Sequence, residues 1–98
     1  MSLSNAHIAA LGVSLHIPAS QSLKEKRRVL KSLKDRIRSQ FNISVSEIGE
    51  MDKWQKGILG MVMISNDRNY LSGSFESVLS LIERVSEIRI IAHKIEFL

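Results

Sequence analysis

SLKEKRRVLKSLKDRIRSQF, residues 22–41, predicts the first helix of the chain and thereby the fold. Ser22 and Glu25 have the spacing of a capping box, in which the hydroxyl and the carboxylate satisfy backbone N–H groups at a helix start. At 100° per residue, the apolar side chains of the stretch share a stripe about 120° wide. These side chains are Leu23, Val29, Leu30, Leu33, Ile37 and Phe41. The stretch is therefore expected to be an amphipathic helix packed on a sheet.

The same helix carries most of the positive charge. It holds eight Lys or Arg residues and two acids, so its net charge is +6, whereas the rest of the chain sums to −2. Helical spacing places six of the cations on the outward arc: Lys24, Arg27, Arg28, Lys31, Lys34 and Arg38. Lys26 falls at the edge of the apolar stripe, and we expect its long stem to carry the ammonium out to solvent.

Strand patterns lie on both sides of this helix. Alternating apolar residues or short apolar runs with turn signals predict four strands. A second helix is expected after the capping residues Asn66 and Asp67, and Gly73 weakens its first turns by about 1 kcal/mol, so this helix is expected to fray or to start late. The predicted strands span His7–Ile17, Ile43–Ile48, Ile58–Ile64 and Ile88–Phe97, with a polar connection over Gly49–Lys56.

The order strand–helix–strand–strand–helix–strand predicts an α+β fold. Two right-handed halves joined by a hairpin give a ferredoxin-like βαββαβ sandwich, with an antiparallel sheet of order 4-1-3-2 and both helices on one face. The third strand is apolar at both parities, which is typical of a central strand. At 98 residues, the chain is expected to form a single domain over residues 1–98, with residues 1–5 flexible or an expression remnant.

Composition narrows the class of protein. The chain has no cysteine, which excludes disulfides and thiolate metal sites. No apolar run approaches the roughly 20 residues that a membrane-spanning helix needs, and the first residues lack the order of a signal peptide. We therefore expect a cytoplasmic protein with no membrane partner. A net charge of +4 and a pI near 9.8 favour polyanionic partners.

The basic helix has a functional and a structural interpretation. Charged helices usually present a solvated face, but here Lys24, Lys26, Arg27 and Arg28 crowd the end where the helix dipole is already positive. Cations at that end cost stability, and such local conflicts often mark functional sites. Free N–H groups, the dipole and the cations together favour a phosphate site.

No catalytic constellation is visible. His7, His16 and His93 lack metal-ligand spacing, and nothing places the acids of residues 47–52 beside a nucleophile. We therefore predict no enzyme, no metal, no cofactor and no small-molecule substrate. The only tryptophan, Trp54, is interpreted as closing the end of the core, with a stacking platform for a base or a partner contact as the alternative.

The stretch SLKEKRRVLKSLKDRIRSQFNISVSEIG, followed by DKWQKGILGMVMISNDR, resembles the YlxP-like family of small bacterial proteins. The most specific pieces are Ser22–Leu33, the Asp52–Trp54–Gln55 element and Ser65–Arg68, and the resemblance spans nearly the whole chain. It implies a ferredoxin-like fold and no established activity. Genes of this family often lie beside those for ribosome maturation and translation initiation factors, which implies a ribosome-associated role.

Two functional hypotheses remain open. In the first, the protein is an RNA- or ribosome-binding accessory protein whose outward cations contact phosphates, with Lys26 aiding at the helix start. In the second, it is a protein-interaction module or a homodimer that uses the open sheet face and has no nucleic-acid role. This hypothesis places Leu59, Met61 and Met63, which share one parity of the third strand, on that open face.

Overall fold

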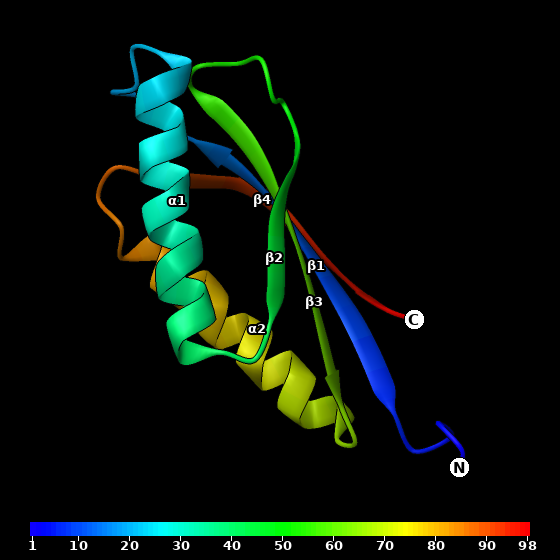
Figure 1. Cartoon of the computed structure of the whole chain (residues 1–98). Helices are drawn as coiled ribbons and strands as arrows, with labels where there is room; N and C mark the ends of the chain where they lie inside the picture. The colour runs from blue at the N-terminus through cyan, green and yellow to red at the C-terminus, as the bar shows by residue number, and fades with distance from the viewer.

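The computed structural model describes all 98 residues, in the element order that the sequence predicts (Figure 1). Neither helix combines the length and the apolar composition needed to cross a bilayer. The strands are β1 (His7–His16), β2 (Ser44–Gly49), β3 (Lys56–Ser65) and β4 (Arg89–Phe97), and the helices are α1 (Leu23–Gln40) and α2 (Arg68–Glu83).

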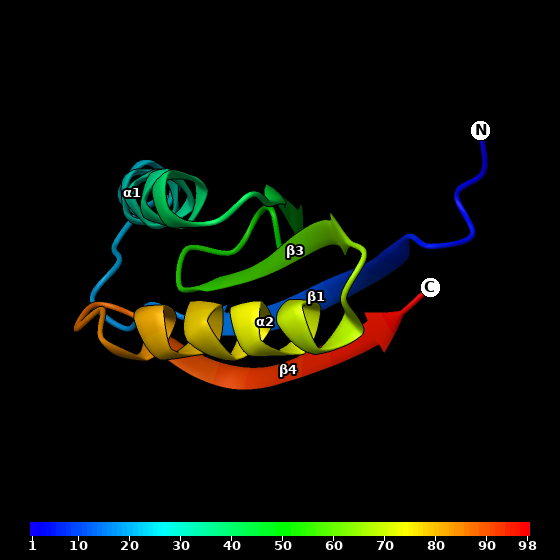
Figure 2. The same cartoon turned by 90° about the horizontal axis from the view of Figure 1, so that it is seen from below.

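The four strands form one antiparallel sheet of order β2-β3-β1-β4, which confirms the predicted ferredoxin-like topology. Central strands β1 and β3 pair over their whole length, from His7 opposite Ser65 to His16 opposite Lys56. Both helices lie on the same side of the sheet (Figures 1 and 2). The sheet therefore has one face covered by helices and one open face.

Period-two alternation decides which strand residues enter the core. Ala9, Leu11, Val13 and Leu15 of β1 are all buried, and the intervening residues lie on the open face. Helix α1 meets this layer with Val29, Leu30, Leu33 and Ile37. These residues are the predicted apolar stripe, apart from its ends, because Leu23 and Phe41 are only partly buried.

Helix α2 begins earlier than the glycine in its first turns suggests. Asp67 caps it, because its Oδ1 accepts hydrogen bonds from the N–H groups of Asn69 at 2.9 Å and Tyr70 at 3.3 Å. The helix then continues without a break through Gly73. The expectation of a late start was wrong: the cap and the packing of Leu71 and Phe75 outweigh a glycine cost of about 1 kcal/mol.

In β3, the buried residues and the open-face residues are the opposite of those that the second functional hypothesis assigns. Leu59, Met61 and Met63 are at most 3% exposed and pack beneath the helices. The open face instead carries Val62 and Ile64, which are 45% and 54% exposed. That assignment of the open face was wrong because a strand that is apolar at both parities gives no signal of which parity faces the helices.

Candidate nucleic-acid interface

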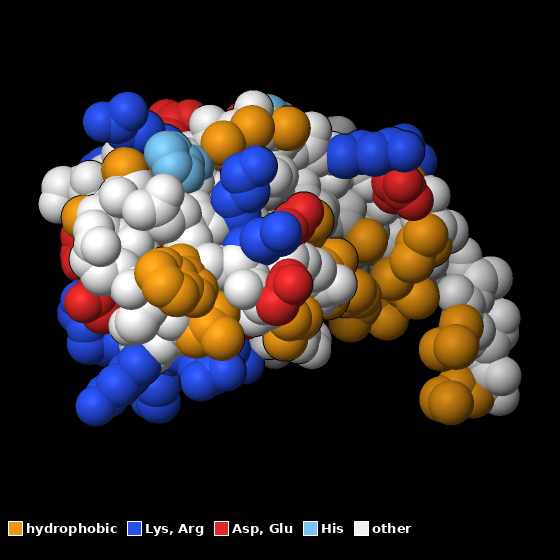
Figure 3. Space-filling model, turned by 90° about the horizontal axis from the view of Figure 1, so that it is seen from above, with side chains coloured by type: hydrophobic (Ala, Val, Ile, Leu, Met, Phe, Trp, Pro, Cys, Tyr) orange, Lys and Arg blue, Asp and Glu red, His pale blue; other side chains and the backbone are white.

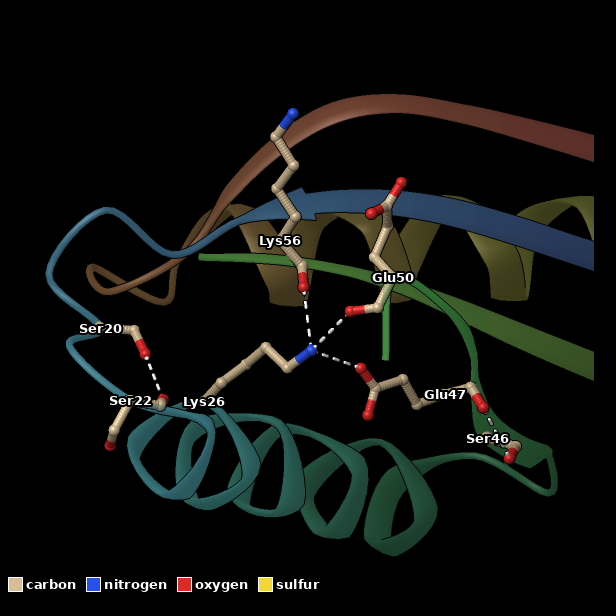
Figure 4. Close-up of polar contacts among 7 residues, drawn as sticks. All are labelled: Ser20, Ser22, Lys26, Ser46, Glu47, Glu50 and Lys56. Carbon is tan, nitrogen blue, oxygen red and sulfur yellow. Dashed lines mark hydrogen bonds and ion pairs between the residues drawn. The ribbon is translucent and has the colours of Figure 1, made fainter. Parts of the chain in front are cut away.

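Lys26 is the polar centre of the end of the molecule where α1 begins. Its side chain is 1% exposed, and its ammonium donates hydrogen bonds to the carbonyls of Glu50 at 2.8 Å and Lys56 at 3.1 Å. Its Nζ also lies 2.9 Å from Oε2 of Glu47 on β2 (Figure 4). An ammonium has three N–H donors, so these three acceptors satisfy it. The expectation that Lys26 reaches solvent and aids phosphate binding was therefore wrong.

Gly57 makes room for this arrangement at the start of β3. A Cβ on Gly57 would lie 3.1 Å from Cδ1 of Leu30 and 3.7 Å from Oε2 of Glu47. A side chain would therefore require Leu30 of α1 to shift by a few tenths of an ångström. The close approach of helix and hairpin is what brings the Lys26 ammonium within reach of two backbone carbonyls.

Gln55 connects the same hairpin by hydrogen bonds to the segment that precedes α1. Its side-chain amide donates to the carbonyls of Pro18 and Ser20, both at 3.1 Å. Its own carbonyl accepts from the N–H of Ile17 at 2.8 Å. The β2–β3 loop is thus bonded to the chain on both sides of the helix start, so its tip has a defined position beside the first turn of α1.

Trp54 lies in this fastened loop but outside the core. Its side chain is 55% exposed, so the interpretation that Trp54 closes the end of the core was wrong. The neighbouring Gln55 is bonded to residues 18–20, directly before α1. The loop lies at the end of the molecule where α1 begins (Figure 1). Its exposed indole is therefore at the same end as the first cations of α1.

The outward cations of α1 fall into two groups. Lys24 and Arg27 are exposed, Lys34 is partly exposed, and none of the three has an ion-pair partner. The other predicted cations have acidic neighbours: Arg28 lies 3.6 Å from Glu87, whereas Lys31 and Arg38 lie 2.9 and 3.7 Å from Asp35. Such exposed pairs contribute about 0 to 1 kcal/mol, so Arg28 and Lys31 remain exchangeable with another anion. Arg38 is more firmly held, because its Nη2 also donates to the carbonyl of Val45 on β2 at 2.9 Å.

Asp35 is the one acid inside the cationic row. A hydrogen bond from Lys31 is the main cause that holds the pKa of Asp35 below its usual value, and the charges of Lys31, Arg38 and Lys34 add to it against an opposing desolvation. The carboxylate therefore stays ionised at neutral pH. It neutralises one charge of the row and competes with any external anion for Lys31.

The start of α1 already has an anion of its own. The hydroxyl of Ser22 accepts from the N–H of Glu25 at 3.1 Å, and Glu25 Oε2 accepts from the N–H of Gln21 at 2.7 Å. The carboxylate thus reaches one residue beyond the predicted cap. With Lys26 also buried, phosphate contacts are expected along the outward row and not on the axis of the helix.

One cation of α1 was missed by sequence reasoning. Arg36 is exposed and has no acidic partner, but helical spacing places it beside Val29, on the opposite flank from Lys34. The signal was its exclusion from the apolar stripe, which is also compatible with a solvated side chain. Figure 3, seen from the end where α1 begins, shows a group of Lys and Arg side chains at the lower left, with others in the centre and along the upper edge and hydrophobic side chains between them. No three His, Asp or Glu side chains come together in a group that could hold a metal ion.

Residues 8–95 match the family described as "Protein of unknown function (DUF503)". The chain is also 42% identical over 67 residues to the uncharacterized protein YlxP of Bacillus subtilis (strain 168), a match that covers 68% of this chain and 73% of that one. Both matches agree with the resemblance read from the sequence, and neither carries an activity.

Solved structures with this arrangement include a de novo designed protein, Foldit4. It superimposes with a TM-score of 0.55 at 11% identity and covers 95% of this chain and 96% of its own. A dimeric ferredoxin-like protein from an uncultured marine organism matches with a TM-score of 0.41 at 9% identity, over 95% of each chain. At such low identity, the match to the designed protein bears on the fold alone.

Proposed function

The chain belongs to the DUF503 family of proteins of unknown function, and we propose that it is a cytoplasmic RNA- or ribosome-associated accessory protein. The observation that carries the proposal is an exposed indole held at the same end of α1 as unpaired cations. Cations attract phosphates without regard to sequence, and an indole stacks on any unpaired base. Trp54, Lys24 and Arg27 together supply both kinds of contact.

The mechanism is electrostatic positioning. Lys and Arg side chains that neutralise phosphates release condensed counterions, which drives binding at low salt. The row of α1 supplies the phosphate contacts, and Trp54 would stack on one base at its end. Single-stranded RNA fits this combination better than a duplex, because its bases are free to stack on a side chain.

The protein-interaction hypothesis uses other residues and stays open beside this one. Its apolar surface lies on the open sheet face, whereas the cations lie on the outer side of α1. Neither surface needs the other. A protein that binds RNA through α1 can also bind a partner through the sheet.

Salt dependence tests the proposal. Four to six phosphate contacts predict a slope of about −3 to −5 when the logarithm of affinity is plotted against the logarithm of salt concentration. The measurement is fluorescence anisotropy with a labelled single-stranded RNA, together with co-sedimentation with ribosomal subunits at low and high salt. An affinity that does not change with salt would overturn the proposal.

Charge reversal locates the contacts. The combined change of Arg27, Arg28, Lys31 and Lys34 to glutamate should abolish binding and leave the fold intact, because none of these side chains enters the core. Arg27→Glu compared with Arg84→Glu is the matched pair, since both arginines are exposed and lack an acidic partner. Equal losses from the two single changes would mean that only net charge matters. A folded four-site variant that binds like the parent would refute the role of α1.

A further inference from the structure

The open sheet face is hollow in the middle. Gly12 of β1 and Gly60 of β3 are paired across the strands, and Ser46 of β2 continues the same row. Around these small residues lies an apolar depression of about 470 Å³. A Cβ on Gly12 would meet no atom within 4 Å, so the depression is open to whatever covers the sheet.

Large apolar side chains project beside this hollow. Ile48 is 63% exposed and leans over Gly60, where its Cδ1 lies 2.9 Å from the position of a Cβ on that glycine. Val62 and Ile64 follow along β3 at 45% and 54% exposure. Small monomeric proteins seldom leave so many branched side chains together in water, which is a reason to expect a partner.

The charge beside the hollow is balanced, although the whole chain is basic and the exposed cations Lys56 and Arg89 lie opposite His16 at one end of the open face. Lys94 and Glu96 of β4 line the hollow, and their charged atoms lie 3.0 Å apart. The chain carries +4 overall. Two copies that meet at the hollow therefore bring a paired charge and not a net positive charge against each other.

We infer that the open face binds a second copy of the chain about a two-fold axis. A two-fold interface must be self-complementary, and this face carries both halves of each contact. Val62 and Ile48 can fill the hollow at Gly12 of the other copy, and Lys94 of each copy can approach Glu96 of the other. For a partner of different sequence, one surface would not need both the projecting side chains and the hollow that receives them. It would also not need both the lysine and the glutamate.

The size of the face agrees with a dimer of moderate strength. Four strands about 4.8 Å apart, three of them nine or ten residues long and β2 six residues long, span about 600 Å². Stable interfaces use about 600 to 1,000 Å² from each partner. The face therefore reaches the lower end of that range, which predicts dissociation at about micromolar concentrations.

The first experiment is sedimentation velocity of the full chain from about 0.05 μM to about 1 mM, a range that brackets a micromolar dissociation constant. The parent should shift from monomer to dimer. Val62→Lys should weaken the dimer by at least about tenfold, as expected for a charge in the centre of an interface. The matched control is Tyr70→Lys on α2, where the side chain is 58% exposed, and it should dimerise like the parent.

Charge exchange distinguishes a second copy from any other occupant. Lys94→Glu alone and Glu96→Lys alone should each weaken self-association, because like charges then face each other. An equimolar mixture of the two variants should form a mixed dimer more tightly than either forms its own. These exposed changes leave the core untouched, so they test the interface even if Val62→Lys fails to fold.

Three results would overturn the inference. One is a parent that stays monomeric to about 1 mM, far above the expected dissociation constant. Another is a folded Val62→Lys variant that dimerises like the parent, since the dimer would then use another surface. The third is a mixture of charge variants that associates no better than either alone. RNA is absent from all these measurements, so their outcome is independent of the proposed function.

Discussion

Two lysines on the first turn of α1 have opposite roles. Lys24 is exposed and has no partner, whereas Lys26 is 1% exposed and binds three acceptors. Two residues of helix turn the side chain by about 200°, from solvent into the joint between helix and hairpin. A cluster of cations in a sequence can therefore combine side chains that stabilise the fold, such as Lys26, with side chains that are free to bind, such as Lys24. Only the free group belongs to a candidate interface.

The largest expected effect is the loss of stability when the buried Lys26 is replaced. Lys26→Met should lower the free energy of unfolding by about 3 to 5 kcal/mol, because it leaves Glu47 and two backbone carbonyls without their shared donor. Chemical denaturation followed by circular dichroism measures the change. Lys24→Met is the control and should change stability by less than about 0.5 kcal/mol. Similar stability for the two variants would mean that the Lys26 contacts do not hold the hairpin.

A smaller effect is expected at the hairpin tip. Trp54→Ala should weaken RNA binding by about 1 to 3 kcal/mol, the usual contribution of one stacked base. The slope of affinity against salt should not change, because the indole neutralises no phosphate. Intrinsic fluorescence of the parent offers a second measurement, since stacking should quench its only tryptophan. Unchanged RNA affinity in the folded variant would leave the cations as the whole interface.

The smallest expected effect is a change in RNA affinity when Asp35, the acid among the exposed cations, is replaced. Asp35→Asn should strengthen RNA binding several-fold, because it removes a negative charge from the row and releases Lys31 and Arg38 from their ion pairs. The salt slope should become steeper by up to about 1, for one additional phosphate contact. Anisotropy titrations at several salt concentrations measure both quantities. Weaker binding would indicate that Asp35 orients the cations for RNA and does not compete with it.

The same carboxylate predicts a pH dependence whose sign follows from its lowered pKa. Its contribution to stability is present above the pKa of Asp35 in the unfolded chain and is lost as pH falls through the lower folded value. Near neutral pH, this contribution is fully present and should not change with pH. Asp35→Asn should remove the contribution, and acid titrations of the two proteins compare it directly.

The fold was predictable because several local signals agreed. The capping residue Ser22, the apolar stripe of α1 and the alternation of β1 each predicted the observed element, and together they fixed the topology. The open face was not predictable in detail. In β3 both parities are apolar, so only the packing of the helices decides that Met61 is buried and Val62 is exposed.

The candidate site was predictable as a helix but not as individual side chains. Helical spacing predicted six outward cations, of which five are exposed and Lys34 is partly exposed. The same spacing puts Lys26 inside the apolar stripe, between Leu33 and Ile37, and not at its edge as predicted, but it could not identify the hairpin carbonyls that bind its ammonium. Those acceptors are separated from Lys26 by at least 24 residues. Trp54 has the same difficulty, because its exposure depends on how Gln55 fastens the loop.

The most specific sequence motifs of the chain contain residues that connect or cap its secondary-structure elements. Gln55 connects the hairpin to the residues before α1, and the carboxylate of Asp67 caps α2. The next residue, Arg68, places its guanidinium 3.8 Å from the ring centroid of Phe97 at the end of β4. Motifs of this kind identify a family through its architecture, which explains how membership can be clear while the activity is not.

Placing both helices on one side of the sheet has a consequence for avidity. Two copies joined through their open faces would carry their α1 helices on opposite outer surfaces, with both sheets between them. A short oligonucleotide could not reach both rows, whereas a long or folded RNA could bind them with two of its segments. The second contact would then form at a high effective concentration, and the protein would favour large RNAs over short ones of the same sequence.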